Sequence, residues 1–398
     1  GTLSVTGAKW FSLLKEEGLP EDYTGDVKFL QGEKEPNPNS HQQIKDWLLM
    51  LGWVPDTFDY KKDDLGNERK VPQIRKDVGG NKELCHSVIE LIDKHPEVAV
   101  LEGLSIIQHR LSIFKGYVEL EKGGWLIASA GGLTNTLRFK HRKPLVNLPS
   151  VGKAWGEDDR GCLIAPEGHV LCGSDMCSLE SITKRHYMKP FDPNYVEEMS
   201  QEGFDEHLDL ARFAGKVSQE DINLYNGGKK PELKAVRNVF KPANYAGVYG
   251  VREKTLSRQT KMSVTECKKL LDAYWERNWS VIKVAEAQRV KTIRGQMWLF
   301  NPVSKFWYSL RYKKDIFSTL NQGTGVYCFD MWVKEFRKVR PQLTGQFHDE
   351  IIATLKPKFK DRYTKLLKES IKKVNDNLKL NVPLDVDIQF GDNYAEIH

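Results

Sequence analysis

The stretch "RNVFKPANYAGVYG", residues 237–250, places a large side chain at every fourth position. These side chains belong to Arg237, Lys241, Tyr245 and Tyr249, and Gly250 closes the run. Residues four apart lie in one slowly drifting row along a helix. The row fits an ordinary helix with its tyrosines in the core and its cations in water. It also fits a surface that presents two cations and two aromatic rings to a ligand, and spacing alone favours the first interpretation.

The bulk composition describes a folded, mildly basic chain. Its 398 residues are enough for two or three domain-sized units, or for one large enzyme with lobes. Hydrophobic residues make up 40% and aromatic residues 10%, which excludes global disorder. The net charge of +6 is compatible with a polyanionic partner but is too small to identify one.

The cysteines and the apolar runs exclude two classes of protein. The six cysteines include no CxxC pair and show no disulfide-framework spacing. There is no signal peptide and no apolar run long enough to span a bilayer. The sequence therefore favours a reduced, cytosolic setting without a membrane.

The first third of the chain alternates helical patterns with charged segments. Residues 1–37 are interpreted as mainly loop, and "SHQQIKDWLLMLGW" (40–53) as an amphipathic helix that begins near a serine. A charged loop is expected at 60–82. Two helical patterns follow, at 82–95 and 97–118, separated by a proline that cannot continue a helix interior.

The rest of the chain indicates an α+β fold. Short strands end in "HVLCGSD" (169–175), and "SLESITKRHYM" (178–188) turns helical. Residues 188–315 are expected to be mostly helical. A further helix at about 322–338 precedes "LTGQFHDEIIATL" (343–355), which is typical of a strand, a tight turn and a strand. We expect one sheet built from distant segments.

Carboxylates occur at a strand end and at a hairpin tip of the predicted secondary structure. Asp175 ends a strand and opens a helix, while Asp349 and Glu350 sit at the predicted hairpin tip after His348. Aspartates that meet across a sheet can hold two Mg²⁺ ions about 3.5–4 Å apart, on either side of a phosphoryl transfer. Magnesium keeps several waters, so few protein carboxylates are needed.

Three motifs, taken in order, resemble a known family. "DMCSLE" (175–180), "RNVFKPANYAGVYG" (237–250) and "QFHDE" (346–350) resemble, in order and spacing, the three signatures of family A DNA polymerases. These are the relatives of bacterial DNA polymerase I and of phage replicative polymerases. In the middle signature every expected position is filled.

Other segments extend the resemblance to roughly residues 37–398. Four of them resemble further family blocks: "TLRF…NLP" (136–149), "GEDDRGCLIAPEGHVL" (156–171), "FDEHLDLA" (204–211) and "STLNQGTG" (318–325). Two resemble the phage branch in particular: "NPNSHQQIKDWLLMLGWVP" (37–55) and "GDNYAEIH" (391–398).

The resemblance implies roles for individual residues. Two Mg²⁺ ions would be held by Asp175, Met176 and Asp349, and the catalytic carboxylates would be Asp175, Asp349 and Glu350. The triphosphate of the incoming nucleotide would be held by Arg237, Lys241 and His207.

The remaining implied roles concern the nucleotide's base and sugar and the DNA. Tyr245 would stack on the nucleotide, while Tyr249 and Glu180 would crowd the 2′ position of its sugar and reject a ribonucleotide. The primer–template duplex would be contacted by Arg138, Gln322 and His348.

The fold implied by the resemblance is a right-hand polymerase with an antiparallel-sheet palm and helical fingers and thumb. Its expected parts are a thumb with the N-terminal segment (1–119), a first part of the palm (120–187), fingers (188–315) and a second part of the palm (316–398). Pro242 lies inside the nucleotide-binding row, so we expect a kink or a local helix start there.

The implied reaction is template-directed transfer of a deoxynucleoside monophosphate to a primer 3′-OH. Its partners would be primer–template DNA and dNTPs, and the chain would act as a monomer without a membrane. The expected setting is phage DNA replication in the cytoplasm of a bacterial host. Only about 36 residues precede the resemblance, so no proofreading exonuclease is expected within this chain.

Several alternatives remain open. A family A polymerase of an organelle, located in the organelle matrix, would share these signatures. A family A repair polymerase would share them too. A single-subunit RNA polymerase shares the palm chemistry, but Glu180 argues against it because that carboxylate penalises a 2′-OH. A reverse transcriptase would more often show a YxDD hairpin, which is absent. A non-catalytic DNA-binding protein would not need Asp175 and Asp349 in these settings.

Overall fold

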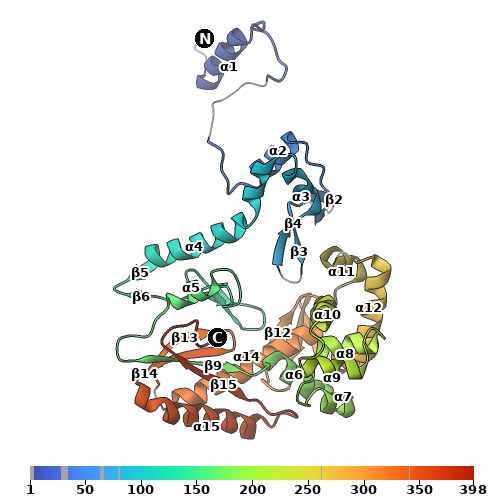
Figure 1. The fold of residues 1–398 in the computed structure, drawn as a ribbon, viewed down its shortest axis with the longest axis vertical. Coiled ribbons are helices and arrows are strands. Elements are labelled where there is room, and N and C mark those ends of the chain that lie inside the picture. Colours follow the sequence, from blue (N-terminus) through green and yellow to red (C-terminus); the bar gives the residue numbers. More distant parts are fainter. Residues whose placement is uncertain (1–3, 28–34, 63–66, 79–80, 261, 340) are drawn as a thin grey trace.

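The computed structural model describes residues 4–27, 35–62, 67–78, 81–260, 262–339 and 341–398. Near the N-terminus, α1 (Val5–Glu16) stands apart from the rest of the chain (Figure 1). The Ser4 side chain accepts a hydrogen bond from the Gly7 amide and so caps this helix. The expectation of a mainly loop-like N-terminal segment is wrong at α1.

The described residues between 41 and 120 form a small unit with its own core around Leu48, Trp53 and Val88. Its elements are α2 (His41–Met50), β1 (Phe58–Lys62), β2 (Glu68–Pro72), β3 (Arg75–Val78), β4 (Asn81–Leu84), α3 (His86–Ile92), η1 (Pro96–Leu101) and α4 (Leu104–Leu120). The helix predicted after Ser40 is confirmed, but the predicted charged loop is two antiparallel hairpins. These strands escape a sequence pattern because β1 and most of β2 carry charged, largely exposed side chains.

The long helix α4 leads from this unit towards a series of short hairpins beside the main sheet (Figure 1). They comprise β5 (Glu121–Lys122), β6 (Trp125–Leu126), β7 (Ala130–Leu133) and β8 (Phe139–His141), followed by α5 (Gly156–Gly161). This agrees with the expected change to short strands and turns.

The main sheet has four antiparallel strands in the order β13-β14-β9-β15. They are β9 (Val170–Met176), β13 (Leu343–Phe347), β14 (Glu350–Leu355) and β15 (Val386–Gly391). Helices α6 (Leu179–Met188), α14 (Ile316–Arg337) and α15 (Lys360–Leu378), with the short η3 (Pro357–Phe359), belong to the same region. The largest core packs Phe329, Trp332 and Phe336 of α14 with apolar side chains of β9 and β14. The expected α+β class, with a sheet built from distant segments, is confirmed.

A cluster of helices lies to one side of the main sheet (Figure 1). It contains α7 (Pro193–Glu198), α8 (Glu206–Phe213), α9 (Gln219–Asn226), α10 (Leu233–Val248), α11 (Glu253–Thr260), α12 (Val264–Arg277) and α13 (Trp279–Glu286). A three-stranded antiparallel sheet follows, made of β10 (Val290–Ile293), β11 (Gln296–Phe300) and β12 (Trp307–Leu310), and then η2 (Lys313–Asp315). The mostly helical expectation missed this sheet, whose strands have only four or five residues.

Helix α10 runs through Pro242 without a break in its helical assignment. It begins at Leu233, so the predicted local start at Pro242 is wrong. The inner face of α10 packs closely: a Cβ on Gly247 would lie 2.5 Å from Cε1 of Tyr274, so only glycine fits there. Close packing along this face holds the helix in place despite the backbone donor that proline lacks.

Candidate active site

Strand pairing brings Asp175, Asp349 and Glu350 together at one end of the main sheet, and we call these three residues the carboxylate edge. Asp175 on β9 lies directly opposite Glu350 on β14 in the antiparallel register. The Met176 amide donates a hydrogen bond of 3.1 Å to the Asp349 carbonyl, which ties the hairpin tip to the end of β9. The predicted meeting of these carboxylates across the sheet is therefore observed.

Like charges dominate the electrostatics of the carboxylate edge. Burial, the Asp349 carboxylate and the Glu350 carboxylate together raise the pKa of Asp175 to about 7. Arg138 offsets part of this charge, because its Nη2 lies 3.8 Å from Oδ1 of Asp349. The edge is therefore a place where negative charge accumulates and a cation would be stabilised.

The carboxylate edge fits a hard divalent cation. Its donors are carboxylate oxygens, which Mg²⁺ prefers, and their mutual repulsion is relieved by a bound positive charge. Among the residues that the structure describes, no three His, Cys, Asp or Glu side chains are arranged to enclose a metal ion. Asp175 and Asp349 would therefore hold Mg²⁺ with much of its coordination left to water or to substrate oxygens.

Glu350 differs from the two aspartates because both of its carboxylate oxygens already have partners. The side chain is buried, with only 6% of the residue exposed. The Tyr394 hydroxyl donates to Oε2 at 2.9 Å, and Nε2 of His398 lies 3.1 Å from Oε1. In the sequence, residues 391–398 show only their resemblance to the phage branch, and no role is predicted for Tyr394 or His398, because their side-chain contacts with Glu350 leave no local pattern in the sequence.

The hairpin tip beside Asp349 carries His348 in a left-handed conformation, with φ of 51°. Its ring centroid lies 5.3 Å from that of His141. Partial burial, Arg138 and His141 lower the pKa of His348, so this ring tends to be neutral. Two of the residues expected to contact DNA, Arg138 and His348, therefore stand together at the carboxylate edge.

The row on α10 is on an open face of the helix. Tyr245 is 53% exposed and Tyr249, the C-terminal cap, is 39% exposed. The interpretation that placed the tyrosines in the core is therefore wrong. Nε of Arg237 forms an ion pair of 2.5 Å with Oδ2 of Asp205, and Nζ of Lys241 lies 5.9 Å from the centre of the Tyr245 ring.

His207 on α8 stands behind this row. Its ring centroid lies 5.5 Å from that of Tyr245, and only 4% of the residue is exposed. Its Nδ1 lies 3.1 Å from the amide nitrogen of Asn244, which also donates to the Glu206 carbonyl. Burial lowers the pKa of His207, so a neutral ring supports the row from beneath.

Tyr249 links the row to two other predicted residues. The Gln322 amide donates a hydrogen bond of 2.9 Å to the Tyr249 hydroxyl. Burial and the charge of Glu180 raise the pKa of Tyr249, while Arg138 lowers it. Asn321, next to Gln322, donates a hydrogen bond of 3.0 Å to the Glu180 carbonyl, five residues after Asp175, so the row and the carboxylate edge border the same space.

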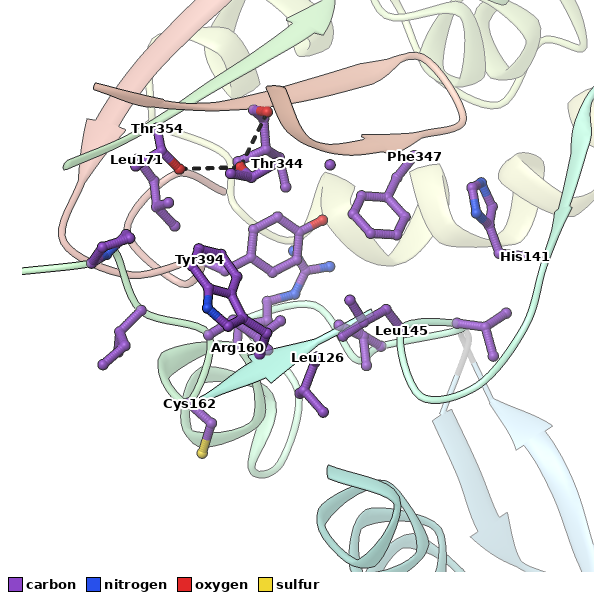
Figure 2. A pocket seen from close by; sticks show the side chains of 18 of the residues that line it. Leu126, His141, Leu145, Arg160, Cys162, Leu171, Thr344, Phe347, Thr354 and Tyr394 are labelled. Atoms are coloured by element: carbon purple, nitrogen blue, oxygen red, sulfur yellow. Dashed lines mark hydrogen bonds between the residues drawn. The ribbon is translucent and has the colours of Figure 1, made fainter. Parts of the chain in front are cut away.

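Two hollows are lined by other described residues. One, of about 300 Å³, lies behind the β13–β14 hairpin and is lined mainly by apolar side chains, with Tyr394 and Arg160 on its wall (Figure 2). None of the three carboxylates lines it. The other is a groove of about 1010 Å³ between the N-terminal unit and residues 152–154, and its lining includes the cations Lys45, Lys61, Arg75, Lys76, Arg110 and Lys153.

Comparisons with known proteins identify the family of this chain. The profile of DNA polymerase family A matches residues 25–396. DNA polymerase I of Caldicellulosiruptor bescii is 23% identical over 359 residues, which span 83% of this chain and 40% of that protein. The chain thus spans about two fifths of the length of this curated relative.

A solved structure shows the same fold. It is described as the POL domain of Pol1 from M. smegmatis in complex with DNA primer–template and dNTP. It superposes with a TM-score of 0.67 at 19% identity, over 92% of this chain and 62% of that one. At 19% identity this similarity shows the fold of the chain.

Proposed function

Because this chain belongs to DNA polymerase family A, we propose that it is a template-directed DNA polymerase that adds deoxynucleoside monophosphates to a primer 3′-OH. The observation that carries this proposal is that α14 joins the two regions: Gln322 donates to the Tyr249 hydroxyl at 2.9 Å, and its neighbour Asn321 donates at 3.0 Å to the Glu180 carbonyl, just after Asp175 in the chain. One space is thus bordered by carboxylates suited to Mg²⁺ and by a cationic and aromatic row suited to a nucleoside triphosphate.

The parts of a right-hand polymerase can be assigned to the observed elements. We assign the thumb and N-terminal segment to residues 1–119 and the fingers to 188–315, with the palm formed by 120–187 and 316–398. The support is that the main sheet takes β9 from the first palm segment and β13, β14 and β15 from the second.

In the proposed reaction, two Mg²⁺ ions would supply positive charge to the attacking and leaving oxygens. Asp175 and Asp349 would hold them through carboxylate oxygens, and Met176 would contribute its backbone carbonyl. Asp175 must be ionised for this role. Its raised pKa therefore makes metal binding weaker as the pH falls through about 7.

The row on α10 would position the nucleotide. Lys241 and Arg237 would bind the triphosphate, and Arg237 is already oriented by Asp205. Tyr245 would stack on the nucleotide from its exposed position. Tyr249, held by Gln322 and close to Glu180, would crowd the 2′ position and so favour deoxynucleotides.

The DNA duplex would bind where positively charged side chains are concentrated. Lysines and arginines that neutralise phosphates supply most of the affinity for a duplex. The groove with six cations on its lining would take part of the duplex between the proposed thumb and palm, and its charge supports this assignment. Gln322, Arg138 and His348 would contact the primer–template close to the reacting end.

The sequence supports a more specific proposal about the kind of family A polymerase. We propose a phage replicative enzyme acting as a monomer in the cytoplasm of a bacterial host, because residues 37–55 and 391–398 resemble that branch. Within the described part of the chain, no helix is both long and apolar enough to cross a membrane. An organellar or repair enzyme is the second candidate.

Primer extension tests the proposed activity. A labelled primer is annealed to a DNA or an RNA template and incubated with Mg²⁺ and either dNTPs or rNTPs. We expect extension with dNTPs on DNA and little with rNTPs. Efficient use of rNTPs would instead favour an RNA polymerase, a preference for RNA template a reverse transcriptase, and no extension a DNA-binding protein.

A further inference from the structure

The buried carboxylate of Glu350 is enclosed by donors that the proposed chemistry does not otherwise use. The Tyr394 hydroxyl contacts one oxygen and Nε2 of His398 contacts the other. The rings of Tyr394 and His398 also pack edge to face, with centroids 4.4 Å apart. The two side chains thus form one unit around Glu350, which we call the Glu350 clamp.

Tyr394 is itself fixed by the segment that precedes β9. Its amide donates a hydrogen bond of 2.9 Å to the Leu163 carbonyl, and its neighbour Asn393 forms a β-bridge with Ile164. The Arg160 guanidinium lies 4.8 Å from the centre of the Tyr394 ring, on the wall of the apolar hollow (Figure 2). Nε of Arg160 in turn donates to the Pro149 carbonyl at 2.7 Å.

The chemistry of the clamp is that of donors to a carboxylate. Burial and the Glu350 charge raise the pKa of Tyr394, so the phenol keeps its proton and donates it. A hydrogen bond to a charged acceptor in a buried place is stronger and more directional than a neutral one. Glu350 is therefore held in one orientation.

That orientation matters because Glu350 lies directly opposite Asp175. A carboxylate at this position without partners would be free to turn towards a divalent cation held by Asp175 and Asp349. A third carboxylate ligand would bind the cation more tightly, but it would occupy a position that water or a phosphate oxygen must take.

We propose that Tyr394 and His398 are positioning residues that hold the Glu350 carboxylate away from the metal ligands. The inference rests on the proposed function, since it describes the same site. Without the clamp, Glu350 becomes an additional ligand: Mg²⁺ binds more tightly, and turnover slows because the substrate oxygens lose a coordination position.

The variants Tyr394→Phe, His398→Ala and His398→Gln test this role. Tyr394→Phe keeps the ring and loses only the donor, and His398→Gln keeps a donor where His398→Ala does not. Tyr187→Phe is the matched control, because it removes another buried tyrosine hydroxyl of this region, one that contacts Thr324 instead of a carboxylate.

Three measurements on each variant of the whole 398-residue chain are needed. Titration with Mn²⁺, followed by electron paramagnetic resonance without DNA or dNTP, gives metal affinity without requiring activity. Primer extension over a range of Mg²⁺ concentrations gives kcat and the Mg²⁺ concentration at half-maximal rate. Thermal unfolding shows whether each variant is folded.

For Tyr394→Phe and His398→Ala we expect kcat to fall about tenfold while Mn²⁺ and Mg²⁺ bind several-fold more tightly. His398→Gln should restore most of both values, and Tyr187→Phe should change neither. Adding Glu350→Gln to Tyr394→Phe should weaken metal binding again, because the additional charged ligand is gone.

The inference is overturned if the clamp variants are folded but keep the metal affinity and kcat of the wild type. It is also overturned if they lose stability alone, as Tyr187→Phe would. A wild-type protein that extends no primer overturns the proposed function instead, and the Mn²⁺ titration then still decides whether the clamp controls metal binding.

Discussion

The carboxylate edge and the row on α10 border the same space, yet one comes from distant strands and the other from a single helix. The row comes from one helix, in which Arg237, Lys241 and Tyr245 follow one another at a spacing of four. The edge comes from strands that are far apart in the chain and that meet only through the register of β9 and β14. Local spacing in the sequence therefore predicts the row on α10, whereas only the pairing of distant strands produces the carboxylate edge.

The two regions also differ in their electrostatic balance. At the edge, like charges raise the pKa of Asp175 to about 7, so the charged form is unfavourable there. In the row, Arg237 is paired with Asp205, and Lys241 is exposed to water. Changes at the edge should therefore affect both chemistry and stability, while changes in the row should affect mainly the nucleotide.

The largest expected effect is at the edge. Asp175→Asn and Asp349→Asn should each lower primer extension by about a thousandfold or more, because each removes a proposed metal ligand. DNA affinity should change little, since it comes mainly from Lys and Arg. Extension and gel-shift assays on the same preparation check this, with the exposed Asp376→Asn on α15 as the control. Near-normal extension by either edge variant would remove that residue from the metal site.

A smaller effect is expected from the aromatic part of the row. Tyr245→Phe should make the enzyme roughly ten- to a hundredfold more selective against dideoxynucleotides, while deoxynucleotide incorporation changes little. A dideoxynucleotide lacks the 3′-OH and so leaves a buried polar position unfilled. We propose that the Tyr245 hydroxyl fills this position. Competition between the two nucleotides at one template position measures the selectivity. If the two proteins discriminate equally, the hydroxyl has no such role.

The cationic part of the row should show an effect of about tenfold. Lys241→Ala should raise the KM for dNTPs by that factor through loss of one charge-assisted contact with the triphosphate. The melting temperature should stay the same, because Lys241 is exposed. Steady-state kinetics beside the exposed Lys268→Ala on α12 checks this. An unchanged KM would show that the row does not bind the triphosphate at this position.

Much of the fold and of the site could be predicted from the sequence where the signal is local. The hairpin of residues 343–355 and the strand that ends near Asp175 both have an apolar pattern and a turn, and both are observed. The hairpins β1–β2 and β3–β4 could not be predicted in this way, because charged residues dominate these short strands.

The same limit applies to the site. The α10 row followed from spacing, but the choice between a core and an open face required the observed exposure of Tyr245 and Tyr249. Tyr394 and His398 carry no motif that points to Glu350. Their role depends on a contact made when residues 391–398 pack beside the strand that carries Glu350.

The smallest expected effect concerns stability and pH. The pKa of Asp175 is raised in the folded state, so ionisation weakens folding as the pH rises from about 4 to about 7. Without Mg²⁺, Asp175→Asn should therefore raise the melting temperature by about 2–4 °C at pH 8 and change it little at pH 5. Thermal unfolding at both pH values checks this, and Lys241→Ala should show no such dependence. Equal shifts at the two pH values would contradict the raised pKa.

The central claim is that Asp175 and Asp349 form one metal site, and metal-directed cleavage tests it directly. Fe²⁺ replaces Mg²⁺ in a complex with a dideoxy-terminated primer–template and the next dNTP, and the radicals it generates with ascorbate and peroxide cut the nearby backbone. We predict cuts near both residue 175 and residue 349 that excess Mg²⁺ suppresses and that Asp175→Asn abolishes at both places. Cuts near 349 that persist in Asp175→Asn, or cuts only elsewhere in the chain, would contradict the account.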